Sequence, residues 1–164
     1  MAETSVTPLQ NGWELGDEFR VERALGHGGF GITYLVRALK DLDDRISAGR
    51  LYVVKEFVLR GYVEREQNGA RLVPVGNDST SQEQNWAFFL RLLDSFRQEA
   101  RTMAKFHHKN IVEVLSVRSG NETAYIIMEY VNGQPLSSRI SQCLHERHTG
   151  LSWPELSPIL MQML

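Results

Sequence analysis

The sequence has little cysteine, no long apolar run and little net charge. Its single cysteine, Cys143, excludes an internal disulfide and is typical of a reducing compartment. No run approaches the roughly 18 consecutive apolar residues that a membrane span needs. The first residues, MAETSVTPLQ, lack the basic and apolar regions of a signal peptide. A formal net charge of −2 gives no general field for nucleic acid or anionic membranes. These absences predict a cytoplasmic protein that binds neither.

The composition suffices for one compact domain, or for one domain and part of another, because 42 % of the 164 residues are hydrophobic. Alternating apolar and charged residues and β-branched runs predict three strands, a helix and two more strands. The strands are expected at 19–25, 32–36, 51–57, 111–117 and 123–131. The helix, in one or two segments, is expected from Ser81, paired with Gln84 in a capping box, to about Phe106.

The remaining segments carry weaker patterns. Residues 1 to about 12 are polar and predict a loose leader without a core of its own. Residues 58–80 predict an irregular insertion with room for one short edge strand, and 136–144 and 151–164 predict short helices. Pro158 conflicts with a last helix capped by Ser152 and Glu155, so Ser157 is the favoured cap and a poorly packed tail is expected.

A glycine-rich loop, Gly26-His27-Gly28-Gly29-Phe30-Gly31, lies between the first two predicted strands. A dinucleotide-binding loop of the same spacing needs a helix after it, whereas a β-branched strand follows here. The loop therefore favours a hairpin tip that covers phosphates, in which glycines let the backbone approach closely and Phe30 shields the site. A flexible hairpin without a ligand is the alternative.

Lys55 lies inside an otherwise apolar predicted strand. Burying its ammonium is costly without a partner. Glu99 lies beside Phe96, Ala100 and Met103 on the predicted helix and thus borders the face expected to pack on the sheet. The two residues are candidates for an ion pair. The alternative for Lys55 is a lysine whose ammonium reaches solvent at a strand edge.

No metal site is expected. Asp41, Asp43 and Asp44 read as a solvated turn. The histidine pairs at 107–108 and at 145 and 148 lack a third ligand at a fixed spacing, which favours solvated histidines. Cys143 reads as a small apolar residue of a short helix rather than as a reactive thiol.

Five motifs in this order resemble the N-terminal lobe of a protein kinase of the bacterial Ser/Thr type, from Phe19 to about Leu164. They are the glycine-rich loop, Val53-Val54-Lys55, Phe96-Arg97-Gln98-Glu99-Ala100, His108-Lys109-Asn110-Ile111-Val112 and Met128-Glu129-Tyr130-Val131-Asn132-Gly133. The resemblance implies an α+β fold: a five-stranded antiparallel sheet with the family's helix C, then helix D and part of helix E of a truncated large lobe. The implied parts are a leader at 1–18, a small lobe at 19–131 with an insertion at about 58–80, and the hinge exit and start of the large lobe at 132–164.

The resemblance also implies roles for residues. Lys55 would hold the α- and β-phosphates of ATP and pair with Glu99, and both are the implied catalytic residues. The loop residues Gly26, His27, Gly28, Gly29, Phe30 and Gly31 would cover the phosphates. The adenine would lie among Leu25, Thr33 and Val53, with Met128 at the back and the backbones of Glu129 and Val131 at its edge. Met103 and Val114 would stack behind Glu99. Thr33 stands where the family usually has Val, and Val53 where it usually has Ala.

The family's catalytic loop HRD and its DFG and APE motifs are absent from these 164 residues. The resemblance implies ATP, protein substrates and, in the complete kinase only, Mg²⁺. The chain alone is expected to bind ATP weakly and to transfer no phosphate. The alternative is a non-catalytic interaction module that self-associates or binds a partner, such as a complete kinase, through the apolar segment 151–164.

Overall fold

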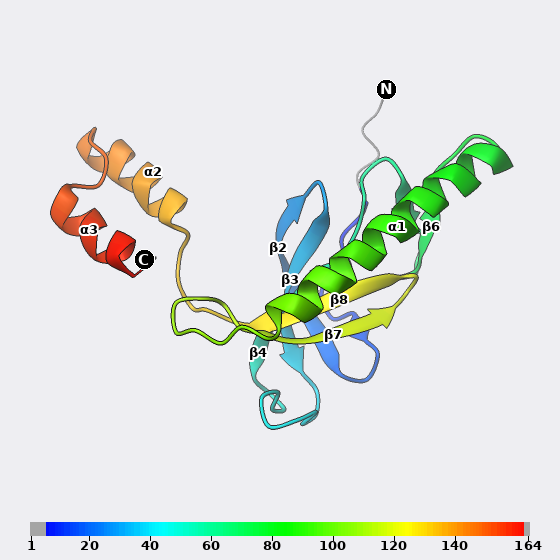
Figure 1. Cartoon of the computed structure of the whole chain (residues 1–164), viewed down its shortest axis with the longest axis horizontal. Helices are drawn as coiled ribbons and strands as arrows, with labels where there is room; N and C mark the ends of the chain where they lie inside the picture. Colours follow the sequence, from blue (N-terminus) through cyan, green and yellow to red (C-terminus); the bar gives the residue numbers. More distant parts are fainter. Residues whose placement is uncertain (1–5, 163–164) are drawn as a thin grey trace. The chain divides into compact units, whose positions relative to one another are not determined.

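The computed structural model describes residues 6–162 (Figure 1). Among these, residues 6–107 and 113–130 form a first compact unit, and residues 108–112 and 131–162 form a second. The first unit holds a curled antiparallel sheet with one long helix, α1, across it (Figure 1). The predicted α+β fold is thereby confirmed.

The sheet has six antiparallel strands in the order β1-β2-β3-β4-β8-β7. Their bounds are Glu14–Leu15 (β1), Phe19–Gly28 (β2), Gly31–Ala38 (β3), Leu51–Glu56 (β4), Thr123–Glu129 (β8) and Val114–Gly120 (β7). The five predicted strands are all present, although β7 begins three residues later than expected. The prediction missed the edge strand β1, because two residues are too short to show an alternating pattern.

Helix α1 is continuous over Ser79–Met103. The predicted capping box is wrong: the N-cap is Asp78, whose carboxylate accepts a hydrogen bond of 2.8 Å from the Ser81 backbone N–H. Phe89, Leu93 and Ala100 are the buried residues of the helix. The ring of Phe57, just after β4, lies 5.3 Å from Phe89 and 5.0 Å from Phe96 between ring centres, and so fixes the helix to the sheet.

The N-terminal segment is packed rather than loose from Val6 onward, so the leader prediction is wrong there. The side chains of Val6 and Leu9 lie in the main core, only 2 % and 4 % exposed. The insertion likewise forms two short strands where one was expected, β5 (Val63–Arg65) and β6 (Leu72–Pro74), which pair in a separate sheet. The packed N-terminal segment and the second strand of the insertion were missed because their few apolar residues are scattered among polar ones.

The second unit contains α2 (Leu136–Arg147) and α3 (Trp153–Met161), where short helices were predicted. The preferred cap at Ser157 is wrong. Ser152 is the N-cap, its N–H and hydroxyl donate to Glu155 Oε2 at 2.9 and 2.7 Å, and Pro158 lies inside the helix. No side chain of α3 is buried, and Met163 and Leu164 of the predicted tail lie outside the described residues. No helix of residues 6–162 is long and apolar enough to cross a membrane.

Candidate functional site

The predicted site residues of the sheet share one face. Thr33 pairs with Lys55, and Val53 pairs with Met128, across neighbouring antiparallel strands. Directly opposed residues project to the same side of a sheet, and residues two apart on β4 do so too. Thr33, Val53, Lys55 and Met128 therefore lie on one face of the sheet, which we call the Lys55 face.

The glycine-rich loop is the tip of the β2–β3 hairpin, where Gly28 pairs with Gly31. None of its four glycines has a positive φ. Close approach is what requires glycine, because a Cβ added at Gly31 would lie 2.7 Å from the Glu56 carbonyl oxygen and 3.4 Å from Lys55 Cε. Phe30 is exposed at the tip, and Leu25 lies at a β-bulge at the start of the loop. The hairpin thus lies directly against Lys55.

The structure does not form the expected ion pair between Lys55 and Glu99. Within residues 6–162 the two side chains make no salt bridge, and Glu99 is exposed. Lys55 Nζ instead lies 6.0 Å from the centre of the Phe96 ring, within the range of a cation–π contact. Phe96 precedes Glu99 by one turn of α1 and occupies the space between the helix and the lysine.

The support behind α1 differs in part from the expectation. Ala100, Val114 and Ile126 form a small buried cluster, against which Phe96, Ala104 and Met128 pack. Val114 therefore supports the helix as predicted, whereas Met103 is 41 % exposed and does not. Phe96, Ala100 and Ala104 recur every four residues and define the face of α1 that meets the sheet, and Met103 lies off this face.

The predicted adenine-edge residues begin at the end of β8. The Glu129 N–H donates to the Glu113 carbonyl at 3.1 Å, and Glu129 Oε1 accepts a hydrogen bond of 3.0 Å from the Glu113 N–H. Val131 is exposed and is the first residue of the C-terminal segment of the second unit. The structure thus brings Gly31, Thr33, Val53, Lys55 and Met128 together. The His27 ring instead contacts Val6, Phe30 is exposed at the tip, and Glu99 is exposed on α1.

Sequence reasoning missed a buried polar cluster on the opposite face of β4. Glu56 is 0 % exposed. Its Oε2 accepts hydrogen bonds of 2.7 Å from the Tyr34 hydroxyl and 2.6 Å from Arg65 Nη2, and its Oε1 accepts one of 3.3 Å from the Tyr125 hydroxyl. The sequence did contain one sign of this cluster: Glu56 falls on the same face of an apolar strand as Val54 and Tyr52, which indicates a buried glutamate.

Burial sets the electrostatics of this cluster. Burial, followed by the negative charge of Glu56, raises the pKa of Tyr34 and of Tyr125 well above the usual value of 10.0. Burial alone would lower the pKa of Arg65, but the hydrogen bond and the charge of Glu56 outweigh it and raise that pKa. Arg65 therefore remains charged, and both tyrosines remain neutral donors.

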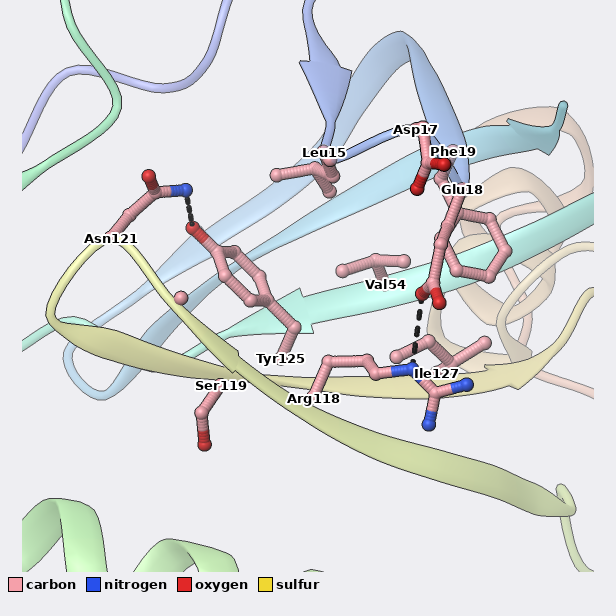
Figure 2. A pocket seen from close by; sticks show the side chains of 12 residues that line it. Leu15, Asp17, Glu18, Phe19, Val54, Arg118, Ser119, Asn121, Tyr125 and Ile127 are labelled. Carbon is pink, nitrogen blue, oxygen red and sulfur yellow. Dashed lines mark hydrogen bonds and ion pairs between the residues drawn. The ribbon is translucent and has the colours of Figure 1, made fainter.

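A pocket of about 360 Å³ lies on the face of the sheet to which Val54 and, two residues further on, Glu56 project. Figure 2 shows the residues that line it. Val54, Tyr125 and Ile127 line it from the sheet, and Leu15 and Phe19 line it from β1 and β2. Its edge is closed by the Glu18–Arg118 ion pair at 3.0 Å and by a hydrogen bond of 2.8 Å from Asn121 to the Tyr125 hydroxyl (Figure 2). This pocket is separate from the predicted nucleotide residues, since Val54 and Lys55 project to opposite faces.

The acidic loop after β3 is structural. Asp43 Oδ1 accepts hydrogen bonds from the N–H groups of Arg45 and Ile46, and Asp41 Oδ1 accepts one from Ala48, at 2.8 to 3.0 Å. Asp41 and Asp43 therefore fix a turn through the backbone, where a solvated turn was predicted. Cys143 is buried in α2, as expected for a small apolar residue.

Comparisons with known proteins point to one family. The family model described as protein tyrosine and serine/threonine kinase matches residues 58–163. The serine/threonine-protein kinase Pkn1 of Myxococcus xanthus is 28 % identical over 73 % of this chain and 13 % of its own length. The probable serine/threonine-protein kinase PknB of Lactococcus lactis is 28 % identical over 82 % of this chain and 16 % of its own length. PksC of Streptomyces coelicolor, also a serine/threonine-protein kinase, is 40 % identical over 58 residues.

The solved structure titled "PpkA-294 apo form" has a TM-score of 0.65 and 26 % sequence identity. The match covers 85 % of this chain and 43 % of that one. This chain spans 10 to 16 % of the length of the three curated relatives named above. Because the family model covers more than half of the chain and the fold agrees, the chain belongs to the protein tyrosine and serine/threonine kinase family, where its relatives include bacterial Ser/Thr kinases.

Proposed function

We propose that the Lys55 face binds ATP and that the chain is the nucleotide-binding portion of a Ser/Thr kinase, which transfers the γ-phosphate to protein hydroxyls. The observation that carries the proposal is the packing of the glycine-rich hairpin against the lysine, with the Cβ position of Gly31 3.4 Å from Lys55 Cε. Backbone N–H groups and one ammonium then lie close together, an arrangement suited to the α- and β-phosphates.

The other residues take roles by position. Gly26, His27, Gly28, Gly29 and Phe30 cover the phosphates, and Leu25, Thr33 and Val53 form the upper wall around the adenine. Met128 closes the back. The Glu129 N–H already donates to Glu113, so its contact with adenine falls to the carbonyl oxygen, and the backbone of Val131 makes the second contact. The pairing of Lys55 with Glu99 remains part of the proposal, although Lys55 Nζ lies near the Phe96 ring in this structure.

Phosphoryl transfer needs groups outside this set. The catalytic aspartate and the Asp and Asn that hold Mg²⁺ belong to motifs that these 164 residues do not contain. A polypeptide of this sequence is therefore expected to bind Mg-ATP weakly and to transfer no phosphate. Protein substrates and Mg²⁺ enter the reaction of the complete kinase.

The second candidate function is a non-catalytic interaction module. It is favoured by the apolar surface of α3, where Trp153 and Met161 are each 70 % exposed and Leu160 is also exposed. Such a surface suits self-association or a kinase partner. The two functions differ in their dependence on Lys55, since an interaction through α3 does not involve it.

Calorimetric titration with Mg-ATP tests the first proposal. Lys55→Met should weaken binding at least about tenfold, since it removes a charge-assisted phosphate contact. The exposed Lys105→Met is the matched control and should bind as the unsubstituted chain does. Equal affinity of both variants, or robust radiolabel transfer by the purified chain, would contradict the proposal. Circular dichroism verifies that each variant is folded.

A further inference from the structure

Four residues near the N-terminus link parts of the first unit that are distant in sequence. The Val6 carbonyl lies 2.9 Å from His27 Nε2 in the glycine-rich loop. The Thr7 carbonyl accepts a hydrogen bond of 2.8 Å from Arg65 Nε of β5, and the Leu9 N–H donates to the Tyr34 hydroxyl of β3 at 3.1 Å. We call residues 6–9 the strap. It contacts the loop, the β5–β6 hairpin and the sheet within four residues.

The strap is anchored by burial as well as by hydrogen bonds. The side chains of Val6 and Leu9 belong to the main core together with Val63 and Leu72 of the β5–β6 hairpin. Its two other partners, Tyr34 and Arg65, both donate to the same oxygen, Glu56 Oε2. One buried carboxylate therefore organises both anchors of the strap, and it belongs to the residue that follows Lys55.

The ring of His27 connects the glycine-rich loop to the strap. A backbone carbonyl only accepts, so Nε2 must carry the proton that is donated to Val6. Arg60 Nη2 lies 3.4 Å from Nδ1, and a guanidinium only donates, so Nδ1 is the acceptor. A proton on Nε2 and a lone pair on Nδ1 satisfy both contacts. The loop is thus held from outside by the strap and by the segment that follows β4.

The other side of the glycine-rich loop packs against β4. Gly31 lies against the carbonyl oxygen of Glu56 and the side chain of Lys55. The Glu56 residue therefore contacts the loop through its backbone and anchors the strap through its carboxylate. Loss of the strap would remove the contact of His27 with Val6 and leave the pairing of β2 with β3, the packing of Gly31 against β4 and the Arg60 contact to hold the loop.

We propose that residues 6–9 are a built-in strap that holds the glycine-rich hairpin against Lys55, with His27 and Glu56 as positioning residues. The inference rests on the proposed function only in so far as the hairpin covers a nucleotide. It predicts that the ATP affinity of the first unit depends on residues 6–9, which lie before the first of the five kinase-like motifs in the sequence.

Hydrogen–deuterium exchange of the full chain without nucleotide tests the strap. His27→Phe keeps a ring but removes the hydrogen bond to Val6, and exchange of residues 26–31 should rise about three- to tenfold, the usual effect of one such bond. His27→Gln, whose amide can donate to the Val6 carbonyl, should restore protection. His145→Phe, an exposed histidine of α2, is the matched control.

A second variant avoids the glycine-rich loop itself. Tyr34→Phe removes the hydroxyl that joins the Leu9 N–H to Glu56, and it should raise exchange both at Leu9 and in residues 26–31. Exchange of residues 26–31 within twofold of the unsubstituted chain in both His27→Phe and Tyr34→Phe would overturn the strap.

Titration with Mg-ATP separates the strap from the proposed function. Weaker ATP binding by His27→Phe, with rescue by His27→Gln, supports the positioning role. Unchanged affinity in a chain that binds ATP overturns that role even if the loop exchanges faster. Absence of ATP binding in the unsubstituted chain overturns the proposed function and the positioning of a nucleotide. The exchange data then still decide whether the strap holds the loop.

Discussion

Lys55 and Glu56 are consecutive residues of β4 whose side chains contact different parts of the first unit. Successive side chains of β4 project to opposite faces, so Lys55 meets the glycine-rich hairpin while Glu56 enters the buried cluster with Tyr34 and Arg65. A buried carboxylate is tolerated only with partners, and Glu56 has three donors. The position of Lys55 is therefore fixed by the residue beside it, on the side away from the proposed nucleotide.

At the residue scale, Gly31→Ala should destabilise the first unit. The new Cβ would lie 2.7 Å from the Glu56 carbonyl oxygen, a backbone atom that cannot move freely. We expect a loss of about 1–3 kcal/mol in the free energy of unfolding, the usual cost of overpacking. Urea unfolding measures it.

Gly29→Ala is the control for this substitution, because nothing lies within 4 Å of its added Cβ and its φ is not positive. It should change the free energy of unfolding by less than about 1 kcal/mol. Equal effects of the two substitutions would mean that close approach is not what requires Gly31.

At the scale of elements, periodicity predicted the parts with a strong pattern and failed where burial depends on distant partners. β4 and β8 were found because their β-branched runs bury one or both faces. The N-terminal segment was read as loose because Val6 and Leu9 are buried by the β5–β6 hairpin, about 60 residues later in the sequence. Met103 was placed behind Glu99 by the resemblance, whereas Ala100 and Ala104 are the residues of α1 that pack in this cluster.

The residues of the candidate site also differ in how far the sequence could place them. Thr33, Val53 and Lys55 were grouped by the resemblance, and the register of β3 with β4 places them on one face of the sheet. The pairing of Lys55 with Glu99 depends on the rotation and distance of a helix, which no local pattern specifies. The buried role of Glu56 was missed because one charged residue in a strand does not indicate which distant residues donate hydrogen bonds to it.

At the same scale, the N-terminus of α3 should depend on pH. The Ser152 N–H, then the Ser152 hydroxyl and Arg147, lower the pKa of Glu155 from 4.5 to about 2. A lowered pKa in the folded state means that the cap is fully formed above about pH 4.5 and is lost as the pH falls toward 2. Carboxyl NMR of Glu155 measures this titration.

Ser152→Ala provides the check on this cause. It removes the hydroxyl donor at 2.7 Å and should move the pKa of Glu155 back toward its usual value. Arg147→Gln should do so to a smaller degree, because this ion pair is exposed and screened by solvent. An unchanged pKa in Ser152→Ala would show that the capping box does not form.

At the scale of the whole molecule, the two units carry different candidate functions. The first unit presents the Lys55 face, and the second presents the apolar surface of α3, in which no side chain is buried. Apolar surface left in water favours association, since burial contributes about 25 cal/mol per Å². The chain alone is therefore expected to self-associate with rising concentration.

The double substitution Trp153→Lys and Met161→Lys should abolish this association in sedimentation velocity experiments, because it places two charges where the exposed side chains lie. The Mg-ATP affinity should stay unchanged, since the Lys55 face belongs to the first unit. Ser138→Lys, at an exposed position of α2, is the control for added charge. If the unsubstituted chain is monomeric at every concentration, the self-association reading of the interaction module fails. A chain that binds Mg-ATP and stays monomeric then leaves nucleotide binding as its function, which the packing of the glycine-rich hairpin against Lys55 supports.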